Sequence, residues 1–557
     1  MTPADLSRAL YDLVLALAER RRAAGDEVVL ELTPDEVTLE RPKLREHGDW
    51  ASSIAMRVAK PLGANPRQIA TELAAGLAEV DGVASAEVAG PGFINVRLDA
   101  AAAGALAETI VLAGQNFGHS DSLAGSVINV EFVSANPTGP LHIGHTRWAA
   151  LGDSISRVLR AAGAEVANEY YINDAGNQME NFGASVLAAA KGEPTPEGGY
   201  PGSYIGELAR QVLEREPKLL ELDDAVALHT ATEIAYELQL AEIRASLARF
   251  NVHFDVWTSE RSLHATSEDG LSDVDTAVER LRAQGHVFED DGAVWVRTTD
   301  FGDDKDRVIR RANGVYTYFA SDAAYYLDKG DRGFAHKIYL LGADHHGYVH
   351  RLKALAGAAG DDPARDIEVL IGQLVSINGA KLSKRAGNII ELDDLQAWLG
   401  TDALRYTLGR YPADSPLTID PEILQRRTND NPVFYVQYAH ARTCAVDRNA
   451  ASVGLDRSVF APELLTHETE SALLGALQEF PRIVAQSAEL REPHRVARYI
   501  EELAGLYHRW YDNCRVLPLG EEPIGALHHT RLWLNDATGQ VLRNGLELLG
   551  VSAPERM

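Results

Sequence analysis

The sequence predicts a multidomain α/β protein built around a doubly wound parallel sheet. At 557 residues the chain is too long for one ordinary core, because domains of about 100–200 residues are usual. The apolar run VINVEFV (127–133) is typical of a strand buried on both faces. A loop rich in proline and glycine follows it, and then amphipathic helical sequence at 145–163. Strand, glycine-containing loop and helix together form the first half of a Rossmann-like unit.

Smaller predicted domains flank this unit on both sides. Residues 1–115 are predicted to form a separate small α/β domain, and a turn-rich segment marks its C-terminal boundary. Its predicted elements are helices at 1–22, 47–60 and 66–80 and a half-buried strand at 92–98. The central Rossmann-like domain is expected at 116–424, with later strands at 337–343 and 367–377 and an insertion at about 190–300. The remainder, 425–557, is predicted to be all-α, with helices at 431–446 and 471–490.

Composition narrows the classes of protein that remain. The net charge of −28 opposes binding of a polyanion, unless arginines gather locally and give a salt-sensitive affinity. The two cysteines, Cys444 and Cys514, show neither CxxC nor Cys/His ligand spacing, which indicates a reducing compartment and no structural metal site. No run of 18 apolar residues occurs, so we expect a cytoplasmic protein without a membrane partner.

Two histidines stand at the predicted helix start in NPTGPLHIGHTR (136–147). Backbone N–H groups and the helix dipole favour an anion there, and the imidazoles of His142 and His145 can donate to phosphate oxygens. Gly144 lacks a Cβ and allows a planar base or ribose to approach the backbone. A structural pair, a zinc site and a dinucleotide fold are alternatives. However, the i, i+4 spacing with glutamate and the GxGxxG turn are both missing.

A second basic segment, NGAKLSKRAGN (378–388), places Lys381 and Lys384 around Ser383 between glycines. Lysine is scarce in this chain, at ten residues against 43 arginines, so two in one tetrapeptide indicate a need for flexible ammonium groups. Such groups can follow a triphosphate through a reaction and neutralise developing charge. Taken alone, the segment is also compatible with a solvated basic loop.

Together the two segments resemble the HIGH and KMSKS signatures of class I aminoacyl-tRNA synthetases. HIGH is matched in full at 142–145, and KMSKS is matched as KLSKR at 381–385, which departs at the second and fifth positions. The resemblance implies His142, His145, Lys381 and Lys384 as catalytic residues. It also implies that ATP, as its Mg²⁺ complex, contacts these four together with Gly144 and Ser383, with no structural metal held by the protein.

Within that class, the chain resembles the arginyl-tRNA synthetase family over essentially its whole length. The similar segments are 130–147, 301–326, 340–354, 434–442, 546–557 and HGDWASSIAMRVAK near the N-terminus. The family implies L-arginine, ATP and tRNA(Arg) as partners, an extra N-terminal domain that contacts the tRNA, and a helical C-terminal domain that binds the anticodon. A monomer is expected.

The same resemblance indicates residues for both ligands. An arginine side chain calls for carboxylates that match its planar, permanently charged fork, and the matching acids are Glu131 and Asp322. The remaining arginine-binding positions are Ser134, Asn136, Tyr318 and His345, the last standing where relatives often have glutamine. The candidate tRNA-binding residues are Tyr435, Gln437, Tyr438 and Arg442.

The expected reaction is two-step arginylation of tRNA, through an arginyl-adenylate and with release of pyrophosphate. A site that hydrogen-bonds a polar side chain can reject analogues by about 10⁴–10⁵ without editing. That fits a chain too short for the editing insertion of the isoleucine, valine or leucine enzymes. Two other classes stay open: a tRNA-independent nucleotidylyltransferase, which would not need the helical domain, and a catalytically silent RNA-binding relative, which would lose the histidines or lysines.

Overall fold

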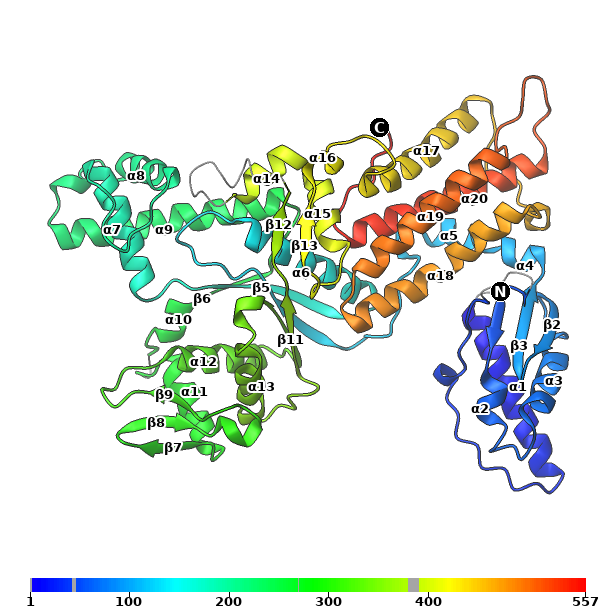
Figure 1. The fold of residues 1–557 in the computed structure, drawn as a ribbon, viewed down its shortest axis with the longest axis horizontal. Coiled ribbons are helices and arrows are strands. Elements are labelled where there is room, and N and C mark those ends of the chain that lie inside the picture. The colour runs from blue at the N-terminus through cyan, green and yellow to red at the C-terminus, as the bar shows by residue number, and fades with distance from the viewer. Residues whose placement is uncertain (1–2, 43–46, 269, 379–389) are drawn as a thin grey trace.

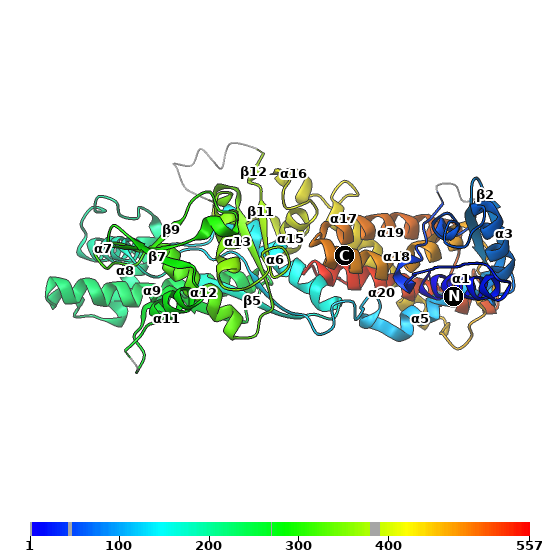
Figure 2. The same cartoon turned by 90° about the horizontal axis from the view of Figure 1, so that it is seen from below.

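The computed structural model describes residues 3–42, 47–268, 270–378 and 390–557. Figures 1 and 2 show an elongated molecule with a parallel sheet near its middle. A helical insertion extends to one end, while the N-terminal domain lies at the other end beside the C-terminal helices. No helix of the described residues is long and apolar enough to cross a bilayer.

The N-terminal part packs three helices on a small antiparallel sheet. Helices α1 (Pro3–Ala23), α2 (Ile54–Val58) and α3 (Pro66–Leu77) accompany strands in the order β1 (Trp50–Ser52), β3 (Phe93–Leu98), β2 (Val83–Ala89). The prediction of one helix over 47–60 is therefore wrong at its start. Trp50 and Ser52 bury alternate side chains and pair with Val96 and Ile94, so local pairing overrides the helical periodicity.

The central sheet confirms the doubly wound prediction. All its strands are parallel, in the order β6 (Val256–Ser259), β5 (Glu165–Ile172), β4 (Val127–Glu131), β10 (His336–Gly342), β11 (Ile367–Gly372). The chain winds outward from β4 in one direction and then returns to β10 on the other side of it. This reversal makes the carboxyl ends of β4 and β10 the topological switch point, where ligands bind in open α/β sheets.

Helix α6 (Ile143–Ala161) covers this switch point. It follows β4 directly and is buried along most of its length, as a crossover helix packed on a parallel sheet must be. Gly152 makes the close approach possible, since a Cβ there would lie 2.2 Å from the Phe132 ring. The predicted strand 367–377 is in fact two strands: β11 ends at Gly372, and β12 (Val375–Ile377) leaves the sheet to pair with β13 (Leu417–Ile419).

Two groups of elements interrupt the sheet. Between β5 and β6 lie α7 (Asn177–Lys191), α8 (Ser203–Arg215) and α9 (Asp224–Arg249), which share a small core of their own. Between β6 and β10 lie α10 (Glu260–His264), α11 (Asp273–Ala283), α12 (Tyr318–Asp331) and the antiparallel strands β7 (Val287–Asp290), β8 (Ala293–Val296) and β9 (Arg307–Arg310). The domain limits expected from the sequence remain a prediction.

The C-terminal part is helical, as predicted. Helix α13 (Tyr348–Ala358) connects β10 to β11, and α14 (Leu392–Leu399) and α15 (Thr401–Gly409) then lead from the sheet to the short α16 (Pro421–Leu424). The helical bundle itself consists of α17 (Pro432–Ser452), α18 (Glu468–Leu490), α19 (His494–Asn513) and α20 (Ala526–Leu548), and α5 (Leu106–Ala113) packs against α20. These helices share one hydrophobic core with the central sheet.

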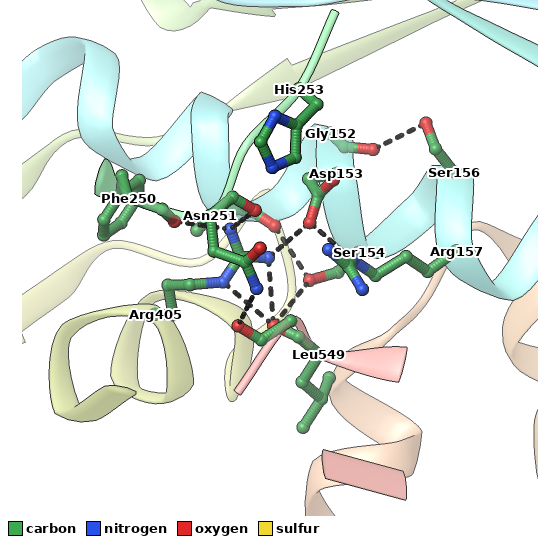
Figure 3. A network of polar contacts seen from close by, with 12 residues as sticks. Gly152, Asp153, Ser154, Ser156, Arg157, Phe250, Asn251, His253, Arg405 and Leu549 are labelled. Atoms are coloured by element: carbon green, nitrogen blue, oxygen red, sulfur yellow. Dashed lines mark hydrogen bonds and ion pairs between the residues drawn. The ribbon is translucent and has the colours of Figure 1, made fainter. Parts of the chain in front are cut away.

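A buried arginine joins the sheet to this bundle (Figure 3). Arg405 of α15 donates to the carbonyls of Phe250, Asn251 and Leu549 at 3.0–3.2 Å and pairs with Asp153 of α6 at 2.5 Å. The planar guanidinium thus satisfies groups at the ends of α9 and α20 at the same time. The end of the bundle is thereby fixed against the helix that carries both histidines.

Candidate active site

The paired histidines begin α6 and cap it. His142 is the N-cap residue: its Nδ1 accepts the Gly144 N–H at 3.1 Å, and the His142 N–H donates in turn to His145 Nδ1 at 3.4 Å. The ring centroids lie 3.9 Å apart. Because both Nδ1 atoms accept, each neutral ring carries its proton on Nε2. The two imidazoles are therefore held as Nε2–H donors at a helix N-terminus.

Burial keeps both rings neutral. It lowers the pKa of His142, and it lowers the pKa of His145 to about 3 with a further contribution from its neighbour His142. At neutral pH the pair therefore offers two hydrogen-bond donors and no fixed cation. A phosphate bound there would be recognised by oriented N–H groups, and its own charge would favour protonation of the rings.

Gly144 is needed beside the first histidine for steric reasons. A Cβ at this position would lie 2.9 Å from His142 Cε1, closer than real contacts allow. We expect Gly144→Ala to displace the His142 ring and to lower turnover by up to about 10²-fold, since small misplacements of a reacting group are that costly. Thermal stability should not fall, because alanine is the better helix former. Steady-state turnover and a melting curve together check this; a stable variant with unchanged turnover would contradict it.

The second predicted motif lies outside the described residues. Lys381, Ser383 and Lys384 fall within 379–389, so their role stays a prediction. The chain that follows them is nevertheless fixed at the histidine loop: the Ile143 N–H donates to Ile390 O at 3.1 Å, and the Leu392 N–H donates to Leu141 O at 2.8 Å. The described chain thus resumes, at Ile390, beside the histidine loop.

A strained turn connects β4 to the histidine loop. Val133 and Ser134 have φ values of 68° and 42°, a region that β-branched residues in particular avoid. Strand β5 holds the turn in place, because the Tyr170 hydroxyl bonds both the N–H and the C=O of Ala135 and the Tyr171 N–H donates to Ser134 Oγ. Strain of this kind persists where the surroundings enforce it, often at functional sites.

Glu131, the first predicted arginine ligand, ends strand β4 at this turn. Its side chain is largely buried, and its Oε2 lies 2.6 Å from the Nζ of Lys329. Its Oε1 accepts from Ser134 Oγ at 3.2 Å, so two predicted ligands contact each other. Each carboxylate oxygen keeps further lone pairs for a ligand.

Asp322, the second predicted acid, is on α12. It accepts a hydrogen bond from the Tyr348 hydroxyl, and burial raises its pKa to about 7 although Tyr348 and Arg351 oppose the shift. Nearby carboxylates, Glu260 and Glu131, raise the pKa further. A carboxyl group that is half protonated at neutral pH and surrounded by other acids is suited to bind a cation.

Glu260 is a third acid that the sequence reasoning missed. It is buried at the start of α10, and burial raises its pKa while a hydrogen bond from Ser321 opposes the shift. It directly follows β6, at the same carboxyl edge of the sheet as Glu131. Had the short run VWTS been recognised as a parallel strand, its position would have indicated this acid.

Of the remaining predicted arginine ligands, Tyr318 lines a cavity of about 960 Å³, whereas Asn136 and His345 lie outside its lining. Tyr318, the first residue of α12, lines the cavity and is 71% exposed. Asn136 donates across the turn to Gln178 Oε1 of α7 at 2.5 Å. His345 ends a short 3₁₀ turn directly after β10 and packs edge-on against Tyr348. Glu260 and Ser321 also line this cavity, so the cavity reaches the acid at the start of α10.

The predicted tRNA contacts lie on α17, far from the sheet. Arg442 donates to the Tyr438 hydroxyl at 2.8 Å and lies over the rings of both Tyr438 and Tyr511. Tyr435 packs against His508. Sequence reasoning missed His508, Tyr511 and Phe434, which complete this cluster of rings.

Gln437 points in another direction from the same helix. Its side chain is buried, and its amide donates to Asp402 Oδ2 at 2.8 Å and to the Ser552 carbonyl at 2.9 Å. These contacts hold the C-terminal tail. Its role toward tRNA stays a prediction.

No group of three His, Cys, Asp or Glu side chains within the described parts of the chain is arranged to hold a metal ion.

Comparisons with known proteins agree along the whole chain. Family models match in order: arginyl tRNA synthetase N terminal domain at 10–98, tRNA synthetases class I (R) catalytic domain at 108–195 and 221–403, and DALR anticodon binding domain at 436–557. The arginine–tRNA ligases of Renibacterium salmoninarum and Paenarthrobacter aurescens are 65% and 62% identical, over 100% of both chains in each case. The Thermus thermophilus arginyl-tRNA synthetase structure aligns over 100% of each chain with a TM-score of 0.71 at 22% identity, a likeness that concerns the fold alone.

Proposed function

The chain belongs to the arginine–tRNA ligase family of class I synthetases, and we propose that different parts of its site bind arginine and ATP. The acids at the sheet edge bind the guanidinium of arginine, and the histidine loop binds the phosphates of ATP. The observation that carries this proposal is the convergence of both at the switch point between β4 and β10, with buried acids on one side and capped histidines on the other.

In the first step the carboxylate of arginine attacks the α-phosphorus of ATP and displaces pyrophosphate, giving arginyl-adenylate. The Nε2–H groups of His142 and His145 face charge that develops on the phosphates, and preorganised donors of this kind stabilise a transition state. Lys381 and Lys384 hold the pyrophosphate side. Mg²⁺ bound to the ATP neutralises part of the phosphate charge.

In the second step a terminal ribose hydroxyl of the tRNA attacks the adenylate carbonyl, AMP leaves, and arginine is esterified to the tRNA. The cavity lined by Tyr318 and Glu260 adjoins the acids and is open, which makes it the route by which the 3′ end reaches the adenylate. No covalent enzyme intermediate is needed.

Arginine-dependent ATP–pyrophosphate exchange, measured with and without tRNA, tests the proposal. We expect exchange with arginine alone among the amino acids, together with charging of tRNA(Arg). Exchange driven by another amino acid would overturn the substrate assignment. Exchange without any transfer to tRNA would indicate a nucleotidylyltransferase, and absence of exchange even with tRNA a silent relative.

The raised pKa of Asp322 predicts a pH dependence of arginine affinity. The arginine cation prefers the ionised carboxylate, so binding releases a proton whenever Asp322 is protonated in the empty site. Below pH 7 the KM for arginine should rise by up to about tenfold per pH unit, and above it the KM should level off. Initial rates between pH 6 and 8.5 measure this, with the KM for ATP as control. A flat arginine KM across pH 7 would contradict it.

The ring cluster between α17 and α19 is proposed to bind the anticodon. Arg442 stacked between Tyr438 and Tyr511 provides a cation and flat surfaces for unpaired bases. We expect Arg442→Gln to weaken tRNA binding by about 10- to 100-fold, and to lower the salt dependence of binding. Filter binding at two salt concentrations checks this, with Arg448→Gln, nearer the C-terminal end of the same helix, as the matched control. Equal losses in the two variants would count against a specific site.

Compartment and assembly follow from the same proposal. Translation takes place in the cytoplasm and consumes the aminoacyl-tRNA that the enzyme would make, and the two cysteines are free thiols, as a reducing compartment favours. The chain is proposed to act as a monomer, which sedimentation at micromolar concentration can measure.

A further inference from the structure

Lys329 is a fully buried lysine that pairs with Glu131, one of the proposed arginine ligands. Its Nζ lies 2.6 Å from Glu131 Oε2, and it lies 4.3 Å and 4.0 Å from the ring centroids of Tyr325 and Tyr339. A buried ammonium is stable only with such partners. Its helix also carries Asp322 seven residues earlier, two turns away on the same face.

This ammonium acts on the predicted ligand Glu131. Lys329 fixes one carboxylate oxygen and Ser134 the other, so the carboxylate is oriented from two sides. It also supplies a countercharge next to this largely buried carboxylate, which removal of the lysine would leave without its ion-pair partner. Glu169, another acid on which Lys329 acts, already accepts with both carboxylate oxygens from one nitrogen of Arg332, Nη2, at 2.9 and 3.0 Å. Glu131 has Lys329 as its cationic partner.

We propose that Lys329 is a positioning residue for arginine recognition. It orients Glu131 to accept hydrogen bonds from the substrate guanidinium, and its charge cancels that of Glu131, so the remaining acids of the site, Asp322 among them, supply the net negative charge for the substrate. The proposal rests on the arginine-binding role proposed above for Glu131. The lysine itself does not touch the substrate.

The chain contains a matched control for this lysine. Lys337 is also buried, pairs with Asp361 at 2.7 Å and lies 4.7 Å from the Tyr326 ring centroid. It is at the amino-terminal end of β10, the edge of the sheet opposite the ligand site. Loss of either ammonium removes the same kind of buried interaction, but only one of them contacts a predicted ligand.

The test compares K329M, K337M, E131Q and the double variant K329M/E131Q by pyrophosphate exchange at saturating tRNA. We expect K329M and E131Q each to raise the KM for arginine about tenfold or more, with the KM for ATP within about twofold of the parent. K337M should lower the melting temperature as K329M does and leave both KM values unchanged. Because Lys329 acts through Glu131, the double variant should be no worse for arginine than E131Q alone.

Three outcomes would overturn the inference. If K329M and K337M changed the arginine KM equally, the lysine would be merely structural. If the two substitutions added fully in the double variant, Lys329 would not act through Glu131. An unchanged arginine KM in E131Q would overturn the proposed role of Glu131 as well. The double variant leaves no unpaired buried charge, so the comparison with E131Q holds even if K329M alone does not fold.

Discussion

Replacing His142 by asparagine is expected to lower kcat for pyrophosphate exchange by about 10²- to 10³-fold, the usual cost of losing one preorganised donor. Asparagine is chosen because it is among the best N-cap residues and can still accept the Gly144 N–H. The helix start is thus retained while the Nε2–H donor is lost. The KM for arginine should stay within about threefold, because the acids are untouched.

A second histidine cap in the chain serves as control. His467 caps α18 in the same way, with its Nδ1 accepting the Thr469 N–H at 3.2 Å. His467→Asn makes the same chemical change far from the site and should leave kcat unchanged. If both variants lost activity together with melting temperature, the effect at His142 would be one of helix stability and not of phosphate recognition.

Replacing Asp322 by asparagine is expected to raise the KM for arginine about 10²-fold or more. The amide keeps the shape of the carboxyl group and can still accept from Tyr348, but it removes the acid whose charge is free to match the guanidinium. The dependence of arginine KM on pH around 7 should disappear in the same variant. The KM for ATP should change by less than about threefold.

Asp361→Asn is the matched control for this change. Asp361 also accepts from a tyrosine hydroxyl, that of Tyr326 at 2.6 Å, but it lies away from the carboxyl edge of the sheet. It should affect stability and not arginine KM. Equal effects on arginine KM from the two variants would show that Asp322 affects arginine binding only by stabilising the fold, and not by contacting the substrate.

Local sequence was sufficient to predict the part of the site that carries the two histidines. The buried strand, the Pro/Gly loop and the amphipathic helix are contiguous, so their periodicity and punctuation predict β4 and α6 and place the histidines at a helix start. The orientation of the rings was not predictable, because it depends on the reciprocal cap between His142 and His145.

The acids of the site could not be predicted from local sequence. Glu131 and Asp322 were predicted from the family resemblance, and their contacts join residues that are distant in the sequence. Glu131 and Lys329 are 198 residues apart, and Asp322 meets Tyr348 from a different helix. No pattern along the chain records such pairs. The positive φ angles at Val133 and Ser134 are likewise imposed by packing against β5, since neither residue type favours them. Strand β1 was missed for the same reason, because pairing with β3 outweighs its helical periodicity.

The histidine loop is proposed to act on ATP, while the acids are proposed to bind arginine. The most direct test is full exchange kinetics of the parent, H142N and D322N, varying arginine and ATP in turn at saturating tRNA. We expect opposite patterns: H142N loses kcat and keeps its arginine KM, whereas D322N raises its arginine KM and keeps its ATP KM. If both variants changed the same parameter to the same extent, that separation would be contradicted.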